Sequence, residues 1–432
     1  GGESMFWSQQ SISTLINPPF ALSFLIILIV LNLIVKSSAP ARLSRPAWST
    51  ATLIIIFGSL IQIKAYAGAL VLGALWVTSA YEIIRAKIHK TSNAPALQLT
   101  KLAAWSTATN ILLFLPLNKS SGNLLVWKPF WFLETMMYLT DRVGWLRFGE
   151  AMMNYRLMGW LFPKTILAYS VAFSIFIFGN LGTRFLSIFL IISWFKNYKK
   201  IDQTQIFILS IIAAGVIIPM LFLQKGTPWN TIQFFYYTLM FASILSGIAF
   251  ARIIEAKQNQ FFKKPLMFGM LFLTLPTTIG TLSQVYLPSR PPSMLPATEV
   301  EALNFLSQQP DGVVMTHPFD PGRAKEESNN PPVPLAYYVS TAYVSAFSNK
   351  DAYLEDEINL DITGYDWKER RKEAEDFYNT LDESHVREFI SKNNIKYFYW
   401  RKGQRARLGE TQLGIERLFE NKEVDIYKVK DF

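Results

Sequence analysis

Isolated charged side chains beside long apolar runs are the residues of this chain best suited to chemistry. Lys64 stands between two apolar runs without an acidic neighbour in sequence, and Arg184 and Lys225 occupy similar gaps. A charge at membrane depth is costly, so it is by default a functional hypothesis. All three cations are candidates for holding a lipid phosphate. The alternative for Lys64 is a side chain that reaches the head groups, and for Arg184 a role in stabilising the fold.

The polar stretch that follows Lys225 is the second candidate. Asn230 and Gln233 are three residues apart, which places them on one helix face, where they could hydrogen-bond sugar hydroxyls. Three aromatic rings of the same stretch could stack on a sugar: Trp229, Tyr236 and Tyr237. The alternative is an aromatic belt at the membrane surface.

Two further groups favour structural roles. Trp127–Glu134, with Asp141 beyond it, is aromatic and amphipathic, and predicts a helix lying on the membrane. The acidic run Glu355–Asp361 lacks the spacing of a calcium loop and predicts a solvated face.

The elements that position these residues follow from composition and charge. Half of the 432 residues are hydrophobic and only 17% are charged. Residues 290–432 carry 19 basic and 25 acidic groups, which leaves 23 basic and 7 acidic groups in residues 1–289. So few carboxylates, with long apolar runs, indicate that the first region faces lipid. Its basic excess is typical of membrane loops and argues against a nucleic-acid partner.

The apolar runs predict an α-helical polytopic membrane protein with about 8–10 membrane segments, followed by a small extracytoplasmic α/β domain. Nine runs approach the length of a span: Phe20–Val35, Trp48–Gln62, Ala69–Ile84, Leu102–Leu117, Ile166–Phe178, Phe185–Phe195, Ile206–Leu223, Ile232–Ala251 and Leu266–Leu282.

Basic loops predict the orientation in a cell membrane. Four loops are expected to be cytoplasmic: Lys36–Arg45, Arg85–Lys101, Lys196–Lys200 and Arg252–Lys264. Nine single crossings cannot place all four on one side. Either one of Ile166–Phe178 and Phe185–Phe195 is a half-crossing, or Leu124–Leu139 hides a crossing.

The predicted boundary between a membrane domain, residues 1–287, and a soluble domain, residues 288–432, is a proline-rich linker. Helices are expected at Ala297–Leu306, Trp367–Tyr378, Glu383–Ser391 and Leu413–Phe419. Strands are expected at Gly312–Thr316, Ala342–Phe347, Ile395–Trp400 and Glu423–Val429. Strands mixed with helices predict an α/β domain.

The chain lacks the residues that several kinds of catalytic or metal site require. The chain has no cysteine and three widely spaced histidines, which excludes thiolate sites and argues against a histidine-built metal site. No phosphate-binding loop, His-Glu-x-x-His or Gly-x-Ser-x-Gly motif is present, which argues against a nucleotide-driven pump.

Several motifs of this chain resemble bacterial multi-pass membrane proteins of the glycosyltransferase C superfamily. They are Gly2-Glu3-Ser4 with Phe6-Trp7, Ile16–Ala21, Ile63–Gly68, Pro129–Phe132, Gly179–Arg184, Trp229–Phe234, Ala342–Phe347 and Leu354–Glu357. The resemblance implies transfer of a hexose or pentose from a polyprenyl-phosphate donor to an acceptor on the outer face.

The resemblance also implies an inverting displacement in which a carboxylate acts as base and cations hold the leaving phosphate. In that superfamily the catalytic Asp or Glu lies in the first outer loop. Glu3 is the only carboxylate before the first apolar run here, so it is a weak candidate. We expect a fragment whose catalytic residue, with any divalent metal, lies upstream of residue 1.

Two other classes compete with the transferase. A transporter or lipid-handling protein would also use broken helices and embedded charges, although no inverted repeat is visible. A membrane anchor for an outer binding domain would not need polar residues among its spans.

Overall fold

The computed structural model describes residues 14, 17–37, 47–90, 92–114, 125–140, 142–225, 228–256, 260–281, 283, 287 and 291–430. The chain divides into two compact units. One is built from residues 1–119, 123–224 and 228–287, and the other contains 288–432 together with 120–122 and 225–227.

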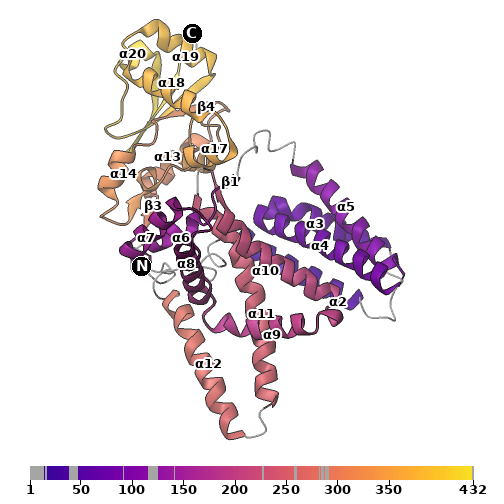
Figure 1. Cartoon of the computed structure of the whole chain (residues 1–432). Coiled ribbons are helices and arrows are strands. Elements are labelled where there is room, and N and C mark those ends of the chain that lie inside the picture. Colours follow the sequence, from indigo (N-terminus) through magenta and orange to yellow (C-terminus); the bar gives the residue numbers. More distant parts are fainter. Residues whose placement is uncertain are drawn as a thin grey trace. The chain divides into compact units, whose positions relative to one another are not determined.

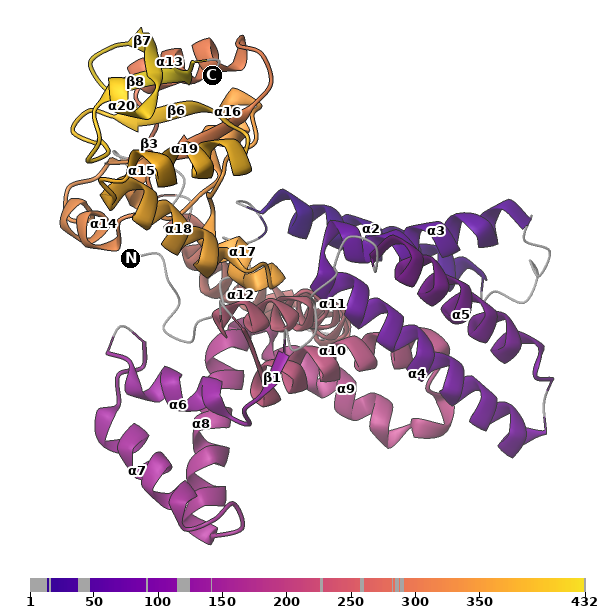
Figure 2. The ribbon, with the colours of Figure 1, turned by 90° about the horizontal axis from the view of Figure 1, so that it is seen from above.

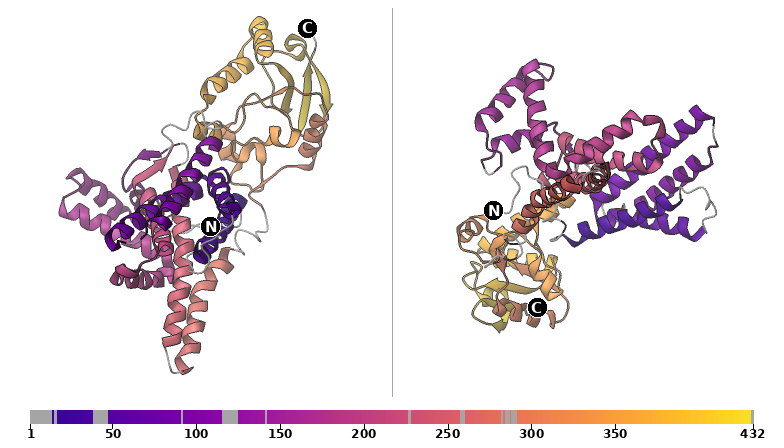
Figure 3. Two further views of the ribbon diagram at one scale, coloured as in Figure 1. Left: turned by 90° about the vertical axis from the view of Figure 1, so that its right-hand side faces the viewer. Right: turned by 90° about the horizontal axis from the view of Figure 1, so that it is seen from below.

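The first unit is helical (Figure 1). Its longer helices are α2 (Pro18–Ser37), α3 (Ala47–Ile63), α4 (Ala65–His89), α5 (Ala94–Phe114), α8 (Pro163–Leu181), α9 (Leu186–Lys196), α10 (Gln203–Leu221), α11 (Ile232–Ala256) and α12 (Gln260–Thr281). Within this unit α3, α4 and α5 pack side by side (Figure 2). The C-terminal part of α11 and the helix α12 project away from the other helices (Figure 3), whereas the rest of α11 packs against α9 and α10.

Short elements connect these helices. Strand β1 (Leu125–Trp127) pairs antiparallel with β2 (Phe222–Gln224), and α6 (Trp131–Tyr138) and α7 (Leu146–Leu157) follow β1. The 3-10 helices η1 (Gly182–Phe185) and η2 (Tyr198–Lys200) flank α9, and η3 (Pro228–Thr231) precedes α11.

Four helical stretches of the described residues are long and apolar enough to cross a membrane: Ala65–His89, Pro163–Lys196, Gln203–Leu221 and Pro228–Glu255. Pro18–Asn32 and Thr50–Ile63 are shorter apolar helices. These apolar helices support the prediction of a helical membrane protein.

The predicted hidden crossing in Leu124–Leu139 is wrong. The described part of this stretch begins with β1 and continues into α6, which has 8 residues. A helix of this length rises about 12 Å, well short of the roughly 30 Å hydrocarbon core. The predicted half-crossing in one of Ile166–Phe178 and Phe185–Phe195 stays a prediction; α8, η1 and α9 together form the apolar helical stretch Pro163–Lys196.

The second unit is a three-layer α/β domain. Its four-stranded sheet has the order β4 (Val313–Thr316), β6 (Ile395–Arg401), β8 (Val424–Val429), β7 (Ile415–Glu420). Strands β4 and β6 are parallel, and the other two pairs are antiparallel. A second, two-stranded parallel sheet joins β3 (Ser293–Met294) to β5 (Val333–Pro334).

Strand β6 is the centre of this domain. Tyr397 and Tyr399 face a core shared with α13 (Ala297–Ser307) and α16 (Tyr343–Ser348). Phe398 and Trp400 face the opposite core, shared with α18 (Trp367–Asn379) and α19 (Glu383–Lys392). Because both faces are covered, the strand is apolar at nearly every position.

The remaining helices of the domain are short: α14 (Pro321–Glu327), α15 (Leu335–Tyr338), α17 (Glu357–Thr363) and α20 (Glu410–Leu413).

Two predicted elements of the domain are wrong. Ala342–Phe347 is not a strand, because the Glu355 carboxylate accepts the amides of Val344 and Ser345 and so caps helix α16. Leu413–Phe419 is not helical, because residues from Ile415 onward pair with β8 as an edge strand. In both cases a partner distant in sequence overrides the local preference.

The predicted solvated face at Glu355–Asp361 is also wrong for its glutamates. Glu357 is buried and accepts two hydrogen bonds from Arg371. Burial raises the pKa of Glu355, although its backbone hydrogen bonds oppose that effect.

We expect residues 291–432 to fold on their own, because their two cores close around one sheet. The isolated domain should be soluble and unfold cooperatively in urea. Phe398→Ala should lower its free energy of unfolding by about 3–5 kcal/mol, since the ring is fully buried. The exposed Lys422→Ala is the control. A domain that aggregates without secondary structure would contradict this expectation.

Candidate functional site

Lys64 lies at the break between α3 and α4. Its backbone is extended, with φ −154° and ψ 110°, which ends one helix and starts the next. A Cβ added at Gly68 would lie 2.6 Å from the Cα of Ile61, so the two helices meet at a distance that only glycine allows. The ammonium of Lys64 lies 5.3 Å from the ring centroid of Tyr66, within cation–π range.

Tyr66 connects this break to a distant segment. Its hydroxyl donates a 2.7 Å hydrogen bond to the Oε1 atom of Gln224, which is 4% exposed at the end of β2. Its ring meets Phe234 of α11 edge-on, with centroids 4.9 Å apart. The structure therefore brings Lys64 to the same end of the helical unit as the start of α11.

The predicted sugar-binding residues divide into two groups. Gln233 donates a 3.2 Å hydrogen bond to the Oδ1 atom of Asn230, and both side chains are half-buried. Trp229 packs beside Trp131, with ring centroids 5.1 Å apart. Tyr236 instead belongs to the core and contacts Phe20 edge-on. Asn230 and Gln233 thus remain closer to the surface than Tyr236.

Tyr237 also belongs to the core. Its hydroxyl shares a 2.7 Å hydrogen bond with Ser23 of α2, and its ring meets Phe20 and Phe24.

The other predicted cations are elsewhere. Arg184 donates from Nε to the Ser243 hydroxyl at 2.7 Å. Ser243 lies ten residues beyond Gln233 on α11, which is about 15 Å along the helix axis. Arg184 is therefore separate from the end of the unit that holds Lys64. Lys225 is exposed and belongs to the second compact unit. Glu3 lies outside the described residues.

Glu134 forms a polar cluster that the sequence did not predict. It is 9% exposed on α6, and its Oε1 atom accepts hydrogen bonds from Arg156 and from the Tyr169 hydroxyl, each at 2.5 Å. Arg156 is 22 residues away on α7. The scarcity of carboxylates in this region was the available signal, but it did not identify the partners.

This cluster joins α6, α7 and α8, so its chemistry is structural. The Oε1 atom of Glu134 already accepts hydrogen bonds from a guanidinium and a phenol, so it is poorly placed to bind a substrate hydroxyl. The described residues contain no group of three or more His, Asp or Glu side chains that could hold a metal ion.

Comparisons with models of known protein families and with curated protein sequences found no match.

Removing the Glu134 carboxylate should destabilise the helical unit. Glu134→Ala leaves Arg156 and Tyr169 without their acceptor, and should cost about 1–3 kcal/mol. The value stays below that of a fully buried pair because the Arg156 side chain is 33% exposed. Thermal unfolding in detergent measures the effect, with the exposed Glu150→Ala on α7 as the control. Equal melting temperatures for the two variants would show that the cluster contributes nothing.

Proposed function

We propose that this chain is an integral membrane glycosyltransferase, or part of one. It would move a sugar from a polyprenyl-phosphate donor to an acceptor on the outer face of the membrane. One observation carries the proposal: a half-buried lysine, an aromatic ring and a group of amides meet at one end of apolar helices. Lys64, Tyr66, Gln224 and the Asn230–Gln233 pair make up this polar end.

The chemistry of this polar end suits a lipid-linked sugar. The ammonium of Lys64 offers three donors to a phosphate and compensates its charge as it becomes a leaving group. The amides of Asn230 and Gln233 offer donors and acceptors to sugar hydroxyls, and the Trp229 ring offers an apolar face. Charged and polar groups of this kind are expensive beside lipid, which favours a role in binding.

Glu134 is not suited to act as the base of the reaction. Glu134, the carboxylate of α6, is already engaged with Arg156 and Tyr169. The resemblance to the glycosyltransferase C superfamily attributes this role to an acidic residue in the first outer loop. Glu3 is the acidic residue that precedes α2 here.

A transporter or lipid-handling protein is the second candidate, because binding a lipid phosphate at Lys64 does not by itself require transfer. The two candidates differ in one observable: only the transferase forms a glycosylated acceptor from the polyprenyl-phosphate sugar.

The proposal includes an extracytoplasmic C-terminal domain. The basic stretch Arg252–Lys264 is typical of a cytoplasmic loop, and one apolar helix, α12, follows it. A phosphatase reporter fused after Phe432, active only outside the cytoplasm, should therefore be active. A fusion between α11 and α12 is the matched control and should be inactive. The reverse pattern would invert the topology.

Replacing Lys64 should weaken binding of the carrier. A charge-assisted contact is worth about 1.5–3 kcal/mol, so Lys64→Met should reduce affinity for a polyprenyl phosphate about 10- to 150-fold. Lys64→Arg should retain part of the affinity because the charge remains. Affinity is measured in nanodiscs, with the polyprenol that lacks the phosphate as a second ligand.

Lys164→Met is the matched control, because Lys164 also lies near an aromatic ring, 5.8 Å from the Tyr155 centroid. It should bind the carrier as the parent does. If Lys64→Met also binds the carrier with unchanged affinity, then Lys64 only reaches the head groups, and the phosphate role is wrong.

A further inference from the structure

The C-terminal domain has a cleft at the carboxyl ends of its two parallel strands. Strand β4 ends at Thr316 and the neighbouring β6 ends at Arg401. In open α/β sheets, ligands bind outside the carboxyl ends of parallel strands, where the connections diverge. The position of the cleft therefore favours a ligand-binding role.

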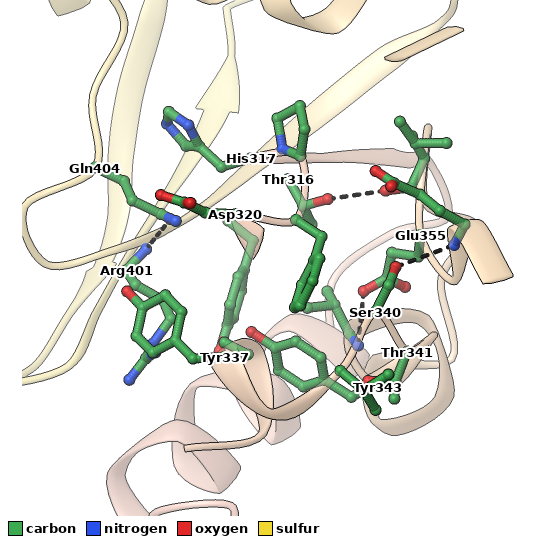
Figure 4. Close-up of a pocket in the computed structure, with 18 residues that line it drawn as sticks. Thr316, His317, Asp320, Tyr337, Ser340, Thr341, Tyr343, Glu355, Arg401 and Gln404 are labelled. Atoms are coloured by element: carbon green, nitrogen blue, oxygen red, sulfur yellow. Dashed lines mark hydrogen bonds between the residues drawn. The ribbon is translucent and has the colours of Figure 1, made fainter. Parts of the chain in front are cut away.

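The cleft consists of an inner cavity, whose lining residues Figure 4 shows, and a neighbouring outer groove. The inner cavity, of about 70 Å³, is lined by Tyr337, Tyr343 and Arg401 among others. The outer groove, of about 830 Å³, includes Arg405 and Arg407. Residues 317–320 and Gln404 border both parts. The cavity is the size of one small polar group, and the groove lies within the roughly 300–1,000 Å³ typical of small-molecule sites.

The carboxylates along the cleft are already used by the chain itself. Asp320 accepts two backbone amides of α14, Glu355 accepts two of α16, and Glu357 accepts two hydrogen bonds from Arg371. In the groove, Glu375 accepts from Arg371 and Glu410 from Arg417. Because these carboxylates already accept hydrogen bonds from the chain itself, the cleft is poorly suited to binding a cation.

Arg401 has donors that are not used. It is 7% exposed and lies 4.6 Å from the ring centroid of Tyr337. Its Nε atom is 3.6 Å from the Oε1 atom of Glu299. The Glu299 carboxylate balances the charge of the guanidinium, but this distance is too long for a hydrogen bond. Among the described residues, neither Nε nor Nη1 has a hydrogen-bond partner. A buried donor without an acceptor is costly, so these atoms call for an oxygen acceptor.

The outer groove also contains guanidinium groups whose hydrogen-bond donors are unused. Arg405 and Arg407 are exposed, and within the part of the chain that the structure describes neither side chain makes an ion pair or hydrogen bond. Next to them, His317 stacks on Tyr378, with ring centroids 3.7 Å apart. Burial lowers the pKa of His317 to about 4, so the ring is neutral at pH 7 and leaves the positive charge to the arginines.

We propose that this cleft binds a small ligand through oxyanion groups, either phosphate or carboxylate. Arg401 would hold one such group in the inner cavity, and Arg405 and Arg407 would hold a second in the outer groove. Guanidinium groups suit both anions because they donate two parallel hydrogen bonds to a pair of oxygens. This inference concerns the C-terminal domain alone and does not depend on the transferase proposal.

The test uses the whole chain in detergent and measures binding of each probe by isothermal titration calorimetry. Two probes carry two oxyanions each, pyrophosphate and di-galacturonate, and a neutral disaccharide is the third. One or both acidic probes should bind, and which one does so identifies the source of the oxyanion. Arg401→Gln should weaken that binding about 10- to 150-fold, and Arg407→Gln about tenfold.

Lys422→Gln removes an exposed positive charge outside the cleft and should bind as the parent does. Arg401→Gln leaves Glu299 buried without its cation, so its unfolding is measured alongside. If that variant does not fold, the exposed Arg405→Gln and Arg407→Gln variants decide. Failure of both acidic probes to bind, stronger binding of the neutral disaccharide, or equal weakening in Lys422→Gln would overturn the proposal.

Discussion

Pairing of β1 with β2 is the interaction on which the arrangement of the helical unit depends. The two strands are about a hundred residues apart in sequence, yet Leu125 pairs with Gln224 and Trp127 with Phe222. Backbone groups in an apolar protein must find partners within the chain. The ladder satisfies those at the end of α10, and the Trp131 indole adds a hydrogen bond to the Phe222 carbonyl. With β2 fixed in this way, Gln224 is placed to receive Tyr66, and α4, α6, α10 and α11 meet at one end.

The C-terminal domain depends on a comparable constraint at β6. This strand is covered on both faces, and its last residue, Arg401, is buried beside Glu299. Glu299 also accepts hydrogen bonds from the hydroxyls of Tyr343 and Tyr399. These contacts raise the pKa of Tyr343 further, beyond the larger effect of its burial. Both of these hydrogen bonds end on the Oε1 atom of Glu299. Among the described residues its Oε2 atom has no hydrogen-bond partner, and neither do the Nε and Nη1 atoms of Arg401.

The two units place their charges in different ways. In the helical unit carboxylates are few, and Lys64 lies at a helix break while Glu134 lies in a closed cluster. In the domain, charges are many and most are paired, and Arg405 and Arg407 differ because neither side chain has an ion-pair partner among the described residues. A lipid-phosphate site and an oxyanion site are therefore supported by separate observations, and either could exist without the other.

The sequence by itself determined the helical segments, the change of composition near residue 288 and most elements of the α/β domain. These follow from local patterns: apolar length, charge and the alternation of side chains. It also indicated Lys64, Asn230 and Gln233 as candidates, because polar residues beside apolar runs are visible without a fold. Only the tertiary structure decided that Tyr66 meets Gln224, that Tyr236 lies in the core, and that Tyr343–Ser348 is helical. The physical reason is that these outcomes depend on contacts between residues far apart in sequence. The Glu355 cap, the β7–β8 pairing and the Glu134–Arg156 pair each override or complete what local preference alone suggests.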